Sequence, residues 1–76
     1  MNKIRRQALC EAIGYLNSAK NIVETAQSEE EDYRDNMPEN LQESDRYHTA
    51  EDACDAMGDA ISNLDDAIEY LTNAIN

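Results

Sequence analysis

The chain has 76 residues, with 17 acidic and 6 basic side chains and a formal net charge of −11. This length allows one small domain, and so negative a surface disfavours direct contact with nucleic acid or anionic membranes. No apolar stretch is long enough to span a membrane, and no signal-peptide core follows the basic N-terminus, so we expect a cytoplasmic protein. Helix-forming residues dominate and β-branched or aromatic runs are missing, which favours an all-α fold.

The first predicted helix covers residues 3–33. Its apolar side chains share one side over an arc of roughly 180°, wider than the stripe that one neighbouring helix covers. These residues are Ile4, Ala8, Leu9, Ala12, Ile13, Tyr15, Leu16, Ala19, Ile22, Val23 and Ala26. Basic residues gather at its start and acidic residues at its end, an order that opposes the helix macrodipole. Either some other contact offsets this arrangement, or the end of the helix frays.

Residues 34–43 form the predicted turn. Pro38 cannot continue a helix from the preceding turn, and it forces Met37 out of the helical region. We expect Met37 and Leu41, its only apolar members, to fold inward and close the end of the core. Ser44 is the expected N-cap of the next helix.

The second predicted helix covers residues 44–75 and carries an unbroken heptad seam with alternating steps of four and three. Its members are Ala50, Cys54, Met57, Ile61, Leu64, Ile68, Leu71 and Ile75. Two helices of nearly equal length joined by a short turn predict an antiparallel two-helix hairpin, coiled-coil-like with an alanine-rich seam, which forms a single domain.

Alanines spaced seven residues apart on both helices suggest a register for this hairpin. Pairs such as Ala19 with Ala60 and Ala26 with Ala53 have residue numbers that total 79, which centres the turn near Glu39. Totals of 72 or 86 would fit the stripes equally well, and the position of the turn selects 79. This register also predicts that Tyr33 and Tyr47 meet near the turn.

The wide apolar arcs predict that two hairpins pack face to face as a homodimeric four-helix bundle. The competing option is that the same face binds a different protein. The residues predicted for this core and dimer seam are Leu9, Ile13, Leu16, Val23, Met57, Ile61, Leu64, Ile68 and Leu71.

The acids of the second helix are the main candidate for partner binding. From Tyr47 to Asn76 there are seven acids and no Lys or Arg. The predicted acidic face consists of Asp52, Asp55, Asp59, Asp66 and Glu69. The seven acids together give one charge per about 4 Å of helix, against one per about 1.7 Å in duplex DNA, so a mimic of nucleic acid would be dilute. The alternative is the solvated face of an amphipathic helix.

The remaining candidates carry no chemistry that the sequence can support. The acidic run of residues 29–32 lacks the pattern of a calcium loop and reads as a solvated helix end. His48 has no nucleophile at a motif position, and Cys54 reads as a core residue distant from Cys10. Gly14 and Gly58 fall on the polar side of their helices, where they either admit a partner backbone or are merely tolerated. We therefore predict no catalytic residue, no cofactor and no metal site.

Residues 36–47 (NMPENLQESDRY) and 60–71 (AISNLDDAIEYL) resemble small, uncharacterised acidic helical-hairpin proteins of bacteriophages and Firmicutes mobile elements. That resemblance implies a phage or mobile-element setting, in which small acidic inhibitors of host defence, anti-CRISPR proteins among them, are found. We expect a non-enzymatic protein-binding module that docks its acidic face on a basic protein surface. The alternative is a structural homodimerisation or scaffold module without inhibitory activity.

Overall fold

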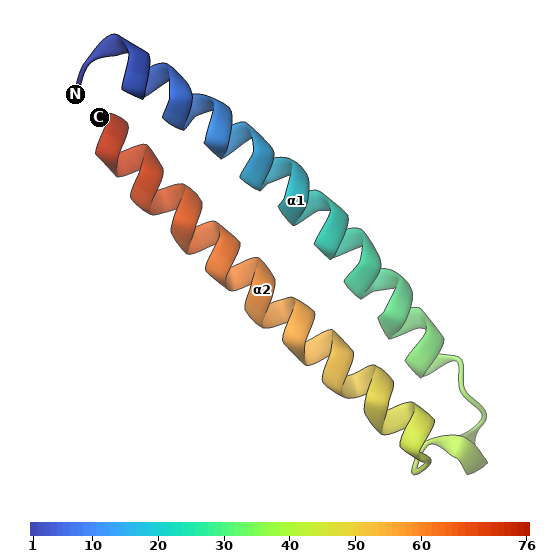
Figure 1. Ribbon diagram of the computed structural model, residues 1–76. Coiled ribbons are helices and arrows are strands. Elements are labelled where there is room, and N and C mark those ends of the chain that lie inside the picture. The colour runs from blue at the N-terminus through green and yellow to red at the C-terminus, as the bar shows by residue number, and fades with distance from the viewer.

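The computed structural model describes all residues from Met1 to Asn76 as an antiparallel pair of long helices (Figure 1). Helix α1 spans Lys3–Asp35 and helix α2 spans Asp45–Ile75, and the connection between them contains a short 3-10 helix, η1, at Glu39–Leu41. The molecule is a rod of 59 × 14 × 13 Å, with both termini at one end and the turn at the other. The predicted all-α helical hairpin is confirmed, and α1 runs two residues further than the sequence suggested.

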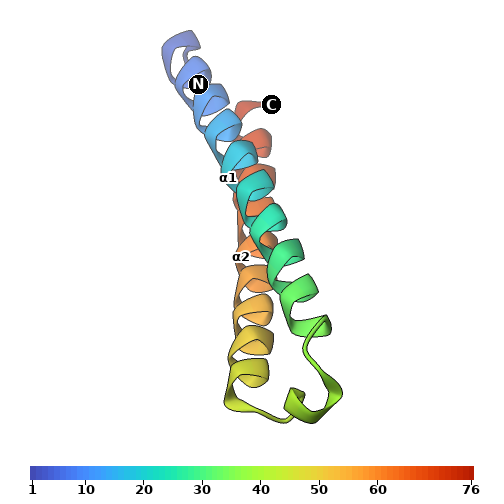
Figure 2. The same ribbon diagram turned by 90° about the vertical axis from the view of Figure 1, so that its right-hand side faces the viewer.

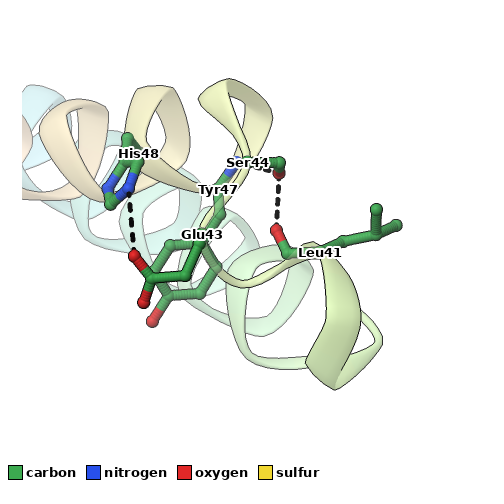
Figure 3. Close-up of polar contacts among 5 residues, drawn as sticks. All are labelled: Leu41, Glu43, Ser44, Tyr47 and His48. Carbon is green, nitrogen blue, oxygen red and sulfur yellow. Dashed lines mark hydrogen bonds and ion pairs between the residues drawn. The ribbon is translucent and has the colours of Figure 1, made fainter.

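Side-chain caps fix the start of both helices. The Arg5 amide donates to Asn2 Oδ1 over 2.8 Å, and the Tyr47 amide donates to Ser44 Oγ over 3.3 Å. Each cap satisfies one of the backbone donors that a helix leaves unpaired in its first turn. The Ser44 hydroxyl also donates to the Leu41 carbonyl, so the same residue ties η1 to the beginning of α2 (Figure 3). The predicted N-cap at Ser44 is therefore confirmed.

The two apolar residues of the turn have different fates. Met37 is 8 % exposed and closes the end of the helix pair as predicted. Leu41 is 41 % exposed, so its predicted inward position is wrong. It ends η1, and its carbonyl faces Ser44 while its side chain points away from both helices (Figure 3). The 3-10 turn thus presents the Leu41 backbone, not its side chain, to the rest of the fold.

The seam between the helices follows the heptad pattern on both sides. Along α1 the half-buried positions include Leu9, Ile13, Leu16, Lys20, Val23, Gln27, Glu30 and Arg34. Along α2 the buried or half-buried positions include Ala50, Cys54, Met57, Ile61, Leu64, Ile68, Leu71 and Ile75. Both series advance by alternating steps of four and three, so antiparallel pairing gives facing residues whose numbers total 84.

Side-chain contacts across the seam agree with this register. Lys20 Nζ lies 2.6 Å from Asp65 Oδ1, and the Gln27 side-chain amide donates to the Cys54 carbonyl over 3.1 Å. A Cβ atom added at Gly58 would lie 3.2 Å from the same Gln27 amide nitrogen. The residue numbers of these pairs total 85, 81 and 85, close to 84.

The alanine register predicted from the sequence is wrong. Ala26 is exposed, and Ala53 lines a shallow groove with Glu30 and Tyr33 instead. The helices are shifted by about five residues, or about 7 Å, relative to that prediction. The predicted Tyr33–Tyr47 pair does not form either. The Tyr47 ring instead lies edge-on to the ring of His48, with centroids 5.9 Å apart.

The shifted register has two consequences for burial. The first turns of α1 project beyond the end of α2, as Figure 2 shows, and Ile4 in the first turn is 78 % exposed. Only Met37, Ala50 and Cys54 are buried in the whole hairpin, all of them in the half nearer the turn. Two helices alone therefore cover little of the apolar surface that this sequence carries.

Candidate functional site

The predicted acidic face is formed by side chains that α2 directs away from α1. All five members are exposed: Asp52, Asp55, Asp59, Asp66 and Glu69. From the first to the last they extend over about 26 Å of helix. The heptad seam fixes this orientation, because residues on the opposite side of the helix must point to solvent once the seam faces α1.

No cation of the hairpin pairs with this acidic face. The ion pairs of the molecule are Lys20 with Asp65, Arg34 with Asp35, and the longer contact of 3.9 Å between His48 Nε2 and Glu43. Asp65 therefore differs from its neighbour Asp66, because Lys20 of α1 neutralises the Asp65 carboxylate across the seam. The five carboxylates of the acidic face remain available to a cationic partner.

All nine residues predicted for the seam are half-buried between the two helices: Leu9, Ile13, Leu16, Val23, Met57, Ile61, Leu64, Ile68 and Leu71. The hairpin itself occupies them, so a second molecule would reach only their outer edges. They are the packing surface of the fold, and the dimer contact assigned to them stays a prediction.

Sequence reasoning missed the polar half of the seam. Lys20, Gln27, Glu30 and Arg34 lie at seam positions of α1, where an apolar residue would ordinarily pack. Their signal was available, since steps of three and four from Leu16 through Val23 reach each of them. The acidic run of residues 29–32 is divided by this geometry, because Glu29 and Asp32 are exposed whereas Glu30 and Glu31 are half-buried.

Neither cysteine nor the histidine forms part of a reactive group. Cys10 is exposed, Cys54 is buried, and both are free thiols. Burial raises the pKa of the Cys54 thiol above its ordinary value, which keeps it protonated at neutral pH and makes it a poor nucleophile. His48 is exposed beside Glu43 (Figure 3). No cluster of three or more His, Cys, Asp or Glu side chains has a geometry suited to a metal ion.

A second surface, apolar in character, is also free. Ile4, Tyr15, Ile22 and Tyr33 are exposed along α1, and Tyr33 shares a groove with Ala50 and Ala53 of α2. The hairpin thus carries two separate candidates for partner contact, one acidic and one apolar. Neither helix combines the length and the apolar character that a membrane crossing requires.

Comparison with known proteins identifies no relative of the chain. No family model, no curated protein and no solved structure matches the chain.

Proposed function

We propose that this hairpin is a small acidic protein-binding module that docks its acidic face on a basic surface of another protein. In this role it acts in the cytoplasm without catalysing a reaction. The sequence resemblance favours an inhibitor, encoded by a phage or mobile element, of a host defence or nucleic-acid-binding protein. The proposal rests mainly on one observation: five exposed carboxylates on one side of α2 have no cationic partner within the molecule.

The physical basis of docking is electrostatic complementarity. A net charge of −11 on a rod 59 Å long attracts basic surfaces and repels nucleic acid, which directs the module to proteins. A face selected only for solubility would usually mix both signs of charge, whereas this face has one. Charges at the rim of an interface act mainly on the association rate and are screened by salt.

Charge reversal tests this proposal in a pull-down from a bacterial host lysate. Replacing Asp52, Asp55, Asp59 and Asp66 by Lys changes the net charge from −11 to −3, since each replacement adds two charges. We expect this variant to lose the protein that the original chain captures, while its helicity by circular dichroism is unchanged. Capture by the original chain should also weaken as salt rises.

A matched control separates the acidic face from overall charge. Replacing Glu24, Asp32, Glu39 and Glu43 by Lys gives the same net charge of −3 at exposed positions outside α2. This control should retain the captured protein. If the acidic-face variant captures it as well as the control does, at low and high salt alike, docking through the acidic face is wrong.

A structural scaffold that works by self-association is the second candidate, favoured by the exposed apolar side chains of α1. It predicts the opposite pattern: reversal of the acidic face has no effect, whereas a charge placed among the exposed apolar side chains of α1, as in Ile22→Asp, removes function while the helicity is retained.

A further inference from the structure

An apolar face runs along one side of the hairpin. Ile4, Tyr15, Ile22 and Tyr33 are 78 %, 68 %, 69 % and 45 % exposed. They are separated by 11, 7 and 11 residues, which are close to whole numbers of helical turns, so they lie on the same side of α1. We define the apolar face by these four residues, the alanines beside them and the alanine stripe of α2: Ala8, Ala26, Ala53, Ala60 and Ala67.

The groove at the turn end joins the contributions of the two helices. It is lined by Tyr33 and Glu30 of α1 and by Ala50 and Ala53 of α2, among others. The large apolar side chains of α1 and the alanine stripe of α2 therefore lie on the same side of the molecule. Small residues on one helix beside large residues on the other form a groove and a ridge, against which a second layer of helices can pack.

The polar contacts between the helices are on the other side of the seam. The only charged residues of α1 between Ala12 and Ala26 are Lys20 and Glu24. Lys20 bonds to Asp65, and Glu24 contributes to its favourable electrostatic environment. The centre of the apolar face, between Tyr15 and Ile22, is consequently free of charge, whereas Glu11 beside Tyr15 and Glu29 beside Ile22 lie toward its two ends.

The total exposed area of the chain indicates how much surface a partner would cover. Folded monomers of 8.6 kDa expose about 4,700 Å² according to the size scaling of globular proteins. The hairpin exposes 5537 Å². The excess of about 800 Å² matches the area that each partner contributes to a stable interface.

We propose that the apolar face packs against the same face of a second copy, and that the two hairpins are antiparallel, with the turn of each beside the termini of the other. This inference develops the second candidate function and does not depend on docking by the acidic face.

Charge distribution along α1 selects the antiparallel arrangement. Exposed Lys3, Arg5 and Arg6 lie at its start, and the acidic run of residues 29–32 lies at its end. These groups are about 39 Å apart, several Debye lengths at physiological salt, so each end interacts separately. Parallel hairpins would bring the two acidic runs together, whereas antiparallel hairpins place the basic start of one α1 beside the acidic end of the other. The order of basic residues first and acidic residues last opposes the macrodipole of a single α1, but it gives attraction between the α1 helices of two antiparallel hairpins.

The positions of the large side chains satisfy two-fold symmetry. Ile4, Tyr15, Ile22 and Tyr33 are placed symmetrically about a point between Ser18 and Ala19. A two-fold axis at that point sets Tyr15 of one copy against Ile22 of the other, and Ile4 against Tyr33, each twice. An isologous interface requires this self-complementary order. The Tyr15 hydroxyl already donates to Glu11 over 3.0 Å, so covering its ring leaves no donor unpaired.

The mass in solution tests whether the second copy binds. We expect sedimentation analysis at micromolar concentration to give twice the chain mass of 8.6 kDa. Ile22→Asp should give the single-chain mass, whereas Asn17→Asp adds the same charge at an exposed position of α1 away from the apolar face and should stay dimeric. A single-chain mass for the unchanged protein with its helicity intact would overturn the proposal.

A cysteine at the symmetry axis tests the arrangement. In a Cys10→Ser background, Ser18→Cys should cross-link two copies under mild oxidation or with a short bismaleimide, because the two substituted positions face each other across the axis. The control Ser62→Cys lies at an exposed position on α2 and should not cross-link. A dimer in which Ser18→Cys fails to cross-link would overturn the antiparallel arrangement. The four-lysine reversal of the acidic face should leave both results unchanged, which separates this inference from acidic docking.

Discussion

At the scale of single residues, the contact between Gln27 and Gly58 explains why a glycine stands in the middle of α2. The Gln27 amide reaches across the seam to the Cys54 carbonyl, and the missing side chain at Gly58 leaves room for it. Gly14 has no such neighbour, since a Cβ atom added there would meet nothing within 4 Å. The sequence offered two readings for both glycines, close approach of a partner backbone or mere tolerance. Gly14 fits tolerance, whereas Gly58 adjoins a side chain of α1, which neither reading named.

These two glycines give a matched pair of substitutions. Gly14→Ala should raise the free energy of unfolding by about 1 kcal/mol, because alanine is the better helix former and the site is open. Gly58→Ala should gain less or nothing, because the new methyl group crowds the Gln27 amide. Urea unfolding of both variants measures the difference. Equal gains at the two positions would show that the Gln27 contact does not constrain Gly58.

At the scale of helices, the elements themselves were predictable and their relative shift was not. Pro38 marked the turn and Ser44 marked the start of α2, because both act through local backbone chemistry. The register was missed because alanine stripes repeat every seven residues and fit several shifts equally well. Lys20 and Gln27 occupy seam positions and make polar contacts that agree with the observed shift, and an apolar pattern does not identify such long polar side chains as seam members.

The two helix caps should differ in their contribution to stability. Ser44→Ala should cost about 1 kcal/mol, because it removes the bond to the Tyr47 amide at a helix start that the turn holds in place. Asn2→Ala should cost less in the free hairpin, because the first turn of α1 projects beyond α2 and can fray without opening the seam. Thermal unfolding of the two variants gives the comparison. A larger loss from Asn2→Ala would mean that the projecting turn is held by further contacts.

At the scale of the whole molecule, the hairpin separates its two candidate surfaces. The acidic face lies on the side of α2 away from α1, and the apolar face spans both helices on another side. The acidic face was predictable because charges on a helix opposite an apolar seam must face solvent. The apolar face was predictable only in part. The wide apolar arc of α1 indicated that some apolar side chains would stay uncovered, but the register decided which of them the seam would bury.

In the proposed dimer, a second copy completes the burial that one hairpin leaves unfinished. The melting temperature as a function of protein concentration, followed by circular dichroism, tests this association most directly. Because association stabilises only the folded chain, the melting temperature should rise clearly between about 1 and about 100 µM protein, and Ile22→Asp should abolish that rise. A melting temperature independent of concentration over this range, in a chain that stays helical, would contradict the claim.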